Sequence, residues 1–327
     1  MKCYDVHGLR LKVVVGSAEL DRRADSILRS FDAPEQDADC YRVSIDYGSV
    51  PVREETPPHM QRLGGVEVGG LRAVSWVGEN SLRRDILGMA RLYVDWGGGE
   101  VRITVRPGAE SCVGRLCIVP MLCVLLGRRG HYLIHGASVA AERRGRWLGI
   151  VLAGPSGSGK STNSLALYKA GFKMLADDAS FLTRRRGGPA GALSLWGLPL
   201  NCKVHKNTLA VMPWLKELPA RPAATKDEFL LELSADDCAD GRFTAEPRLM
   251  FFLGSRNRHE HRLRPLDKVE AMAELTRQNI RAGGDNLEGA AEAFRLFGRL
   301  IKHADSYSLS VGPQLETLGG EIRSMLG

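Results

Sequence analysis

The chain has 327 residues, of which 44% are hydrophobic and 25% are charged, and its formal net charge is +7. These values are ordinary for a globular protein, and the length suits one large or two modest domains with ample core. Basic residues are spread along the chain without a basic arm, a helix-turn-helix or an RNP signature, so no nucleic-acid partner is expected.

Apolar segments and cysteines predict a cytoplasmic protein without a membrane partner. The first residues, MetLysCysTyrAspValHisGly, lack the apolar core of a signal peptide. The longest apolar run, 116–126, is interrupted by Pro120 and is too short to cross a bilayer. The cysteines contain no CxxC pair, which favours small core residues in a reducing compartment over a metal cluster. They are Cys3, Cys40, Cys112, Cys117, Cys123, Cys202 and Cys238.

Residues 1–129 predict a smaller N-terminal α+β module. Apolar and polar residues alternate in several short segments, which favours an antiparallel sheet with one solvated face. Apolar residues at helical spacing predict a helix over 18–31. The expected strands are 11–15, 41–45, 65–68, 71–77 and 100–105. The module carries no catalytic constellation, and we expect it to recognise a substrate or partner.

Residues 130–327 predict a second, α/β domain, which makes the chain α+β overall. A buried strand is expected over 147–153, a helix over 161–170 that Gly171 ends, and a short buried strand over 172–176. Further expected elements are a strand-like segment at 193–200, helices over 267–282 and 287–304, a strand over 306–311 and a helix over 314–326.

A glycine-rich loop between the first of these strands and its helix matches the phosphate-binding pattern G-x-x-x-x-G-K-[ST] at every defined position. Glycines allow a tight turn with inward N–H groups, and the helix N-terminus adds its dipole to the anion site. Lys160 would reach the β- and γ-phosphates, and the Ser161 hydroxyl would bind Mg²⁺. A glycine turn without a ligand is the alternative. The loop consists of Gly154, Pro155, Ser156, Gly157, Ser158, Gly159, Lys160, Ser161 and Thr162.

Two carboxylates, Asp177 and Asp178, follow the strand expected over 172–176. Parallel strands present ligands beyond their carboxyl ends, so this strand would bring both acids beside the phosphates. One could hold Mg²⁺, and the other could accept the proton of an attacking hydroxyl. A turn or a helix cap is the alternative interpretation.

The segments HisGlyAlaSerVal (135–139), the loop with its strand (149–161) and LeuAlaAspAsp (175–178) resemble the catalytic domain of HPr kinase/phosphorylase. A more remote likeness extends to ATP-dependent phosphoenolpyruvate carboxykinase. The resemblance implies an HPr-kinase/PEP-carboxykinase-like P-loop core, with Asp177 as base and with Asp178 and Ser161 at the metal. It also implies a role near the phosphates for His135, which by itself would more often be structural.

The resemblance weakens after the acids. The family carries Glu and Arg before a Gly-rich turn, where this chain has Ser194 and Trp196. This favours a divergent member, similar to the lasso-peptide tailoring kinases. Basic residues that could complete the site are Lys203, Lys206 and Lys226, of which Lys226 matches a basic residue that approaches the triphosphate in related kinases. A basic cluster further along the chain could also complete the site, and a solvated surface is the alternative interpretation. It consists of Arg256, Arg258, His259, His261, Arg262 and Arg264.

These observations predict an enzyme that transfers the γ-phosphate of ATP, with Mg²⁺, to a hydroxyl, foremost a serine of a peptide or protein. Two alternatives stay open: a kinase for a small metabolite such as a sugar alcohol or an amino acid, and a nucleotide-binding scaffold or switch. Both acids argue against the scaffold, because binding alone needs no base. HPr kinases assemble as hexamers, so a homo-oligomer also stays open.

Overall fold

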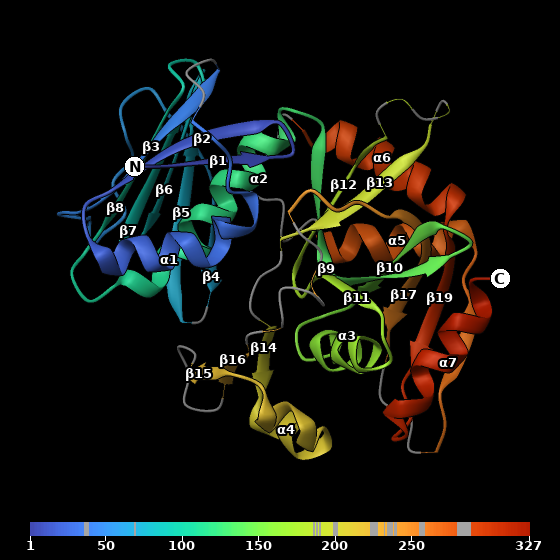
Figure 1. The fold of residues 1–327 in the computed structure, drawn as a ribbon. Coiled ribbons are helices and arrows are strands. Elements are labelled where there is room, and N and C mark those ends of the chain that lie inside the picture. The colour runs from blue at the N-terminus through green and yellow to red at the C-terminus, as the bar shows by residue number, and fades with distance from the viewer. Residues whose placement is uncertain are drawn as a thin grey trace. The chain divides into compact units, whose positions relative to one another are not determined.

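The computed structural model describes two compact units, residues 1–129 and residues 130–279 with 289–327, each built on a large mixed sheet (Figure 1). This is an α+β architecture, as the sequence predicts. The described residues are 1–35, 39–68, 70–185, 187, 189, 191–198, 202–222, 228–231, 233, 238, 241–254, 259–279 and 289–327.

The first unit contains an eight-stranded sheet in the order β1-β2-β3-β8-β7-β6-β5-β4. Its strands are β1 (Lys2–Val6), β2 (Leu9–Val15), β3 (Cys40–Tyr47), β4 (Gln61–Val68), β5 (Leu71–Val77), β6 (Ser81–Ile86), β7 (Ala90–Asp95) and β8 (Glu100–Val105). The expectation of a purely antiparallel sheet is wrong for β2, β3 and β8, which run parallel to one another. For β2 and β3 the reason is the helix α1 (Ala18–Leu28), which carries the chain from β2 back to the start of β3 and so makes a parallel pair.

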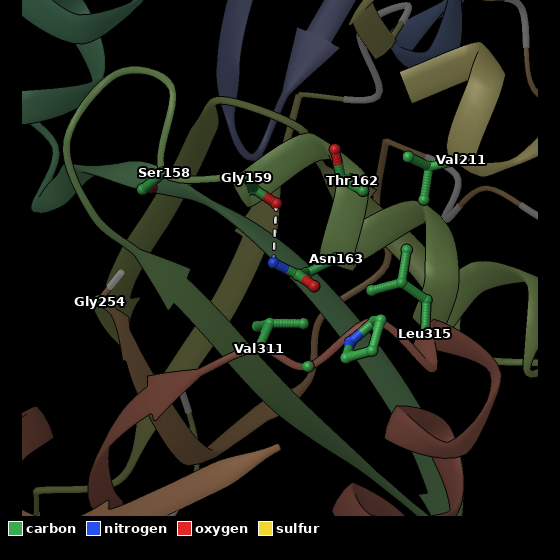
Figure 2. A pocket seen from close by; sticks show the side chains of 10 residues that line it. Ser158, Gly159, Thr162, Asn163, Val211, Gly254, Val311 and Leu315 are labelled. Carbon is green, nitrogen blue, oxygen red and sulfur yellow. Dashed lines mark hydrogen bonds between the residues drawn. The ribbon is translucent and has the colours of Figure 1, made fainter. Parts of the chain in front are cut away.

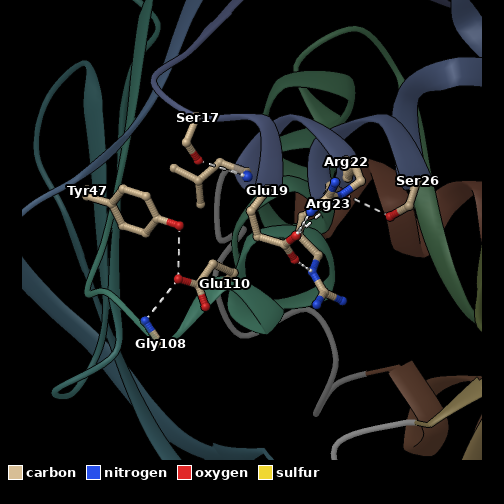
Figure 3. Close-up of polar contacts among 9 residues, drawn as sticks. Ser17, Glu19, Arg22, Arg23, Ser26, Tyr47, Gly108 and Glu110 are labelled. Carbon is tan, nitrogen blue, oxygen red and sulfur yellow. Dashed lines mark hydrogen bonds and ion pairs between the residues drawn. The ribbon is translucent and has the colours of Figure 1, made fainter.

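Local hydrogen bonds fix the ends of this unit's helices (Figure 3). The Ser17 hydroxyl accepts a bond from the Leu20 amide and caps α1. The Glu110 carboxylate accepts bonds from the Tyr47 hydroxyl at 3.0 Å and from the Gly108 amide at 2.9 Å. Bonds from its own backbone amide and that of Gly108 lower the pKa of Glu110. The short helix η1 (Arg29–Phe31) follows α1.

A helical run from Glu110 to Gly127 is long and apolar enough, by length and composition alone, to pass for a membrane span. It comprises η2 (Glu110–Cys112), the π-helix η3 (Val113–Ile118) and α2 (Val119–Gly127). The run is longer than the predicted apolar segment, because polar residues precede that segment on the same helical path. Within the protein, 61% of it is buried, as in a core helix.

The second unit contains a sheet in the order β13-β12-β9-β10-β17-β19-β18, with β11 also paired to β9. Its strands are β9 (His131–Arg143), β10 (Arg146–Ala153), β11 (Lys173–Ala176), β12 (Ala179–Arg184), β13 (Leu193–Gly197), β17 (Glu246–Leu253), β18 (Arg262–Pro265) and β19 (Asp305–Ser310). A two-residue turn at Arg144 and Gly145, both with positive φ, joins β9 to β10 in a hairpin.

Helices cover both faces of this sheet (Figure 1). Ile150 and Leu152 of β10 pack with residues of α3 and α7, whereas Val151 and Ala153 pack with residues of α5 and α6. Both faces of β10 are therefore buried, which explains its continuous apolar sequence. The helices are α3 (Lys160–Lys169), α5 (Lys268–Asn279), α6 (Ala290–His303) and α7 (Leu315–Met325).

A three-stranded sheet in the order β14-β16-β15 also belongs to this unit. It consists of β14 (Cys202–His205), β15 (Ala220–Pro222) and β16 (Glu228–Leu231), with α4 (Lys206–Val211) and η4 (Pro213–Glu217) between the first two strands. The buried side chains Cys202, Val204 and Leu231 join the core around α3. None of the seven cysteines, all of which lie in the described ranges, forms a disulfide.

Candidate active site

The loop 154–159 leaves β10 at Ala153 and enters α3 at Lys160, so a strand, a glycine loop and a helix follow one another as predicted. Gly157 and Gly159 have φ of 79° and 95°, a region that favours glycine. At Gly154 a Cβ would lie 2.6 Å from the Ser158 Oγ. The glycines are thus required by the path of the loop, which brings its backbone around the N-terminus of α3.

Lys160, the first residue of α3, directly follows this loop and is 9% exposed. Its ammonium donates hydrogen bonds to the carbonyl oxygens of Gly154 at 2.8 Å and Pro155 at 3.1 Å. Burial lowers the pKa of Lys160, and the nearby carboxylates of Asp178 and Asp177 offset part of that effect. The ammonium therefore contacts the loop carbonyls and is close enough to both acids for their charge to act on it.

The acid pair follows β11, which runs in the same direction as β10 but is not its neighbour. Strand β9 lies between them and is antiparallel to both. In the register, Gly136 of β9 lies opposite Ala153, the last residue of β10, and the Gly136 amide donates to the Asp178 carbonyl at 3.2 Å. Both strands thus end at the same edge of the sheet. The acids lie beside the loop, with one strand between.

The two carboxylates have different surroundings. Asp177 is buried, and its Oδ2 accepts a hydrogen bond of 3.1 Å from the backbone amide of Lys203, the second residue of β14. Asp178 is more exposed, and its Oδ1 lies 3.1 Å from the Nδ1 of His135 on β9. The structure therefore brings together His135, Lys160, Asp177 and Asp178.

The backbone of His135 is anchored as well. Its amide donates to the Asn279 Oδ1 at 2.8 Å, and the Asn279 amide group donates to the Leu275 carbonyl at 2.8 Å. Asn279 is a buried polar residue at the end of α5 that sequence reasoning missed, since a lone asparagine carries no motif. It ties the position of His135 to the packing of α5.

Hard oxygen ligands are available for a magnesium ion. Mg²⁺ is typically held by one or two carboxylates, hydroxyls and substrate phosphates rather than by a complete protein cage. Asp178 and the Ser161 hydroxyl in the first turn of α3 fit this donor chemistry. Within the described ranges, no group of three or more His, Cys, Asp or Glu side chains could by itself hold a metal ion.

The positions where the sequence departs from the family pattern lie in the core. Trp196 stacks on Phe181 with ring centroids 4.5 Å apart, and its indole N–H donates to the His131 Nδ1 at 3.1 Å. Ser194, two residues earlier on β13, is also buried. These side chains are buried and are part of the protein's interior.

The other predicted basic residues separate into three groups. Lys226, Arg256 and Arg258 lie outside the described residues. Arg262 and Arg264 are on β18 and pair with Glu260 and Glu270, as expected of a solvated surface. Lys203 reaches Asp177 through its backbone, whereas Lys206 is exposed at the start of α4.

A pocket of about 220 Å³ lies against the loop and was not predicted (Figure 2). No sequence signal could have found it, because its residues come from four separate segments without a shared motif. It is lined by Ser158, Gly159, Thr162, Asn163, Val211, Gly254, Val311, Gly312, Pro313 and Leu315.

No protein-family model and no curated protein matches this chain. Among solved structures, the HPr(Ser) kinase/phosphatase from Coxiella burnetii is similar with a TM-score of 0.29 and 14% sequence identity. The match covers 60% of this chain and 99% of that one. At this TM-score the structural relation is distant, and it carries no statement about activity.

Proposed function

We propose that this protein is an ATP-dependent kinase with an HPr-kinase-like P-loop core that transfers the γ-phosphate to a hydroxyl group. The observation that carries the proposal is the convergence of Lys160 and the acid pair beside the glycine loop. The lysine supplies positive charge for phosphates, and the acids supply a proton acceptor and a metal ligand.

The loop and the start of α3 would bind the triphosphate. Backbone N–H groups and the positive end of the helix dipole favour an anion there. The Lys160 ammonium donates to two loop carbonyls, and a short side-chain rotation would exchange one of them for a phosphate oxygen. Because the charge is buried, its attraction to a phosphate is stronger than at a solvated surface.

Asp178 and Ser161 would hold Mg²⁺, and when bound the ion neutralises charge on the phosphates. His135 would fix the Asp178 carboxylate through their 3.1 Å contact. Such outer contacts commonly set the orientation of a metal ligand. His135 is therefore a positioning residue in this proposal.

Asp177 would accept the proton of the acceptor hydroxyl. As the acceptor oxygen bonds to the γ-phosphorus, the bond between that phosphorus and the bridging oxygen breaks, and ADP leaves. The proton passes to the Asp177 carboxylate, whose orientation is held by the Lys203 amide. A buried carboxylate with one fixed oxygen suits this role better than the more exposed Asp178.

For the acceptor we propose a serine of a peptide or protein, on the support of the sequence resemblance around His135, the loop and the acids. The test is transfer from γ-labelled ATP with Mg²⁺ in an extract of the source organism, separated into peptide and small-molecule fractions. Label in peptides that is lost with Lys160→Met supports the proposal. Label only in small molecules indicates a metabolite kinase, and tight ATP binding without transfer indicates a scaffold.

A further inference from the structure

The pocket against the loop lies on the side of β10 away from the acids. The strand order places β9 and the acid pair on one side of β10, and β17 and β19 on the other. Gly254 directly follows β17, and Val311 to Pro313 follow β19, so the pocket occupies the same sheet edge as the acids. A triphosphate lying along the loop with its γ-phosphate toward Asp178 would extend its nucleoside end toward this pocket.

The walls of the pocket suit a flat apolar group. Val211 of α4, Val311, Pro313 and Leu315 of α7 provide aliphatic surface around it (Figure 2). Its volume of about 220 Å³ is smaller than the roughly 300–1,000 Å³ of sites that enclose a whole drug-sized ligand. The pocket therefore fits one part of a nucleotide, and the aliphatic lining indicates the base.

Three polar side chains, Ser158, Thr162 and Asn163, also line the pocket, and Asn163 of α3 is the most buried of them. It is 3% exposed, and its Nδ2 donates to the Gly159 carbonyl at 2.9 Å. Its Oδ1 is buried and has no hydrogen-bond partner among the described residues. Since a buried acceptor without a donor is unfavourable, this oxygen is a ready acceptor for a ligand N–H. The bond to Gly159 fixes the amide, so the pocket presents the oxygen and not the nitrogen (Figure 2).

The far wall is held in place by His261. The Gly312 amide donates to the His261 Nδ1 at 2.9 Å, and the His261 Nε2 is 2.9 Å from the Gln314 carbonyl, to which it donates. A Cβ at Gly312 would lie 2.5 Å from the Glu260 carbonyl carbon, so the turn fits tightly. The wall formed by Val311 and Pro313 is thus preformed, which lowers the ordering cost of binding.

We infer that this pocket binds the adenine base of ATP, with the Asn163 amide oxygen accepting a hydrogen bond from the 6-amino group. The inference rests on the proposed function, since it takes the loop as the triphosphate site. A fixed acceptor favours a 6-amino purine over a 6-oxo purine, whose carbonyl would place a second acceptor against it. Asn163 is therefore a specificity-determining residue for the nucleotide.

Calorimetric titration with Mg²⁺ and three probes, ADP, IDP and tripolyphosphate, tests the inference. IDP replaces the 6-amino group with a carbonyl, and tripolyphosphate has no base. Wild-type protein should bind ADP roughly tenfold more tightly than IDP, as expected for one buried hydrogen bond. In Asn163→Leu the two affinities should become equal.

A pocket-filling variant, Val311→Phe, separates the base from the phosphates. It should weaken ADP binding by about tenfold or more, as overpacking does, while tripolyphosphate binding stays unchanged. The matched control is Val269→Phe, at a 79% exposed position of α5 that does not line the pocket, and it should change neither affinity.

Two results overturn the inference while leaving the proposed function intact. One is equal affinity of the wild type for ADP and IDP, which needs no variant to be observed. The other is a Val311→Phe variant that binds ADP and tripolyphosphate more weakly by the same factor. A wild-type protein that binds none of the three probes would instead remove the proposed function, and the inference with it.

Discussion

The backbone amide of Lys203 donates a 3.1 Å hydrogen bond to the Oδ2 of Asp177. This bond links β14, the first strand of the small sheet, to the acid that follows β11. Asp177 is buried, so one of its oxygens is fixed by the fold rather than by solvent. The candidate base is therefore oriented before any acceptor arrives, and general-base catalysis depends on such orientation.

Replacing His135 by Phe should raise the Mg²⁺ concentration needed for half-maximal transfer. The substitution removes the 3.1 Å contact with Asp178, and the loss of such a contact typically costs about 10–100-fold in metal affinity. The measurement is the initial rate of transfer over a Mg²⁺ titration. His303→Phe, an exposed histidine at the end of α6, is the control and should leave the titration unchanged. An unshifted curve for His135→Phe would contradict the positioning role.

Lys160 should make stability depend on pH. Burial lowers its pKa in the folded protein, whereas the unfolded value is roughly 10.4. Between the two values the unfolded chain binds more protons, so the free energy of unfolding rises with pH. Below both values both states are protonated, and the cost of burying the charge is fully present.

The check compares wild type with Lys160→Met by denaturant unfolding at pH 7 and pH 9.5. The wild type should gain more stability over this interval than the variant, which lacks the titrating group. Identical changes in the two proteins would show that the lysine is not desolvated. The same variant should no longer bind ATP.

Gly136 should not tolerate a side chain. A Cβ there would lie 2.8 Å from the Leu152 carbonyl oxygen in the paired strand, and backbone atoms can give way only by moving β9 from β10. Gly136→Ala should therefore destabilise the protein by about 1–3 kcal/mol, the usual cost of overpacking. Thermal unfolding measures this as a lower Tm.

The matched control is Gly320→Ala on α7, where the added Cβ meets nothing within 4 Å. Alanine is the better helix former, so this change should stabilise the protein by about 0.5–1 kcal/mol. If both substitutions shift Tm in the same direction, the close approach of β9 and β10 at Gly136 is refuted.

The loop and its neighbours were predictable because the signal is local. A buried strand, glycines at positions of positive φ and a helix occur within 24 residues, from 146 to 169, and the structure has them in that order. The nearness of the acids to the loop also follows from the chain direction after α3. What the sequence did not reveal is that β9 lies between β10 and β11, because strand pairing over long separations leaves no local pattern.

Two further features were hidden for identifiable reasons. Strand β6 reads SerLeuArgArgAspIle, and its charges obscure the apolar alternation. The structure buries Asp85 by pairing it with Arg83 at 2.5 Å and Arg91 at 2.9 Å. The pocket beside the loop depends on Asn163, Val211 and Val311, which only the folded chain brings together.

The most direct test of the account is the role of Asp177 in phosphoryl transfer. Asp177→Asn keeps the size of the side chain but removes the proton acceptor, so transfer from γ-labelled ATP should fall by about 10²–10⁴-fold, the usual contribution of a general base. ATP binding, measured by calorimetry on the same samples, should persist. Asp305→Asn, an exposed aspartate on β19, should leave transfer unchanged. Transfer at the wild-type rate by Asp177→Asn would contradict the account.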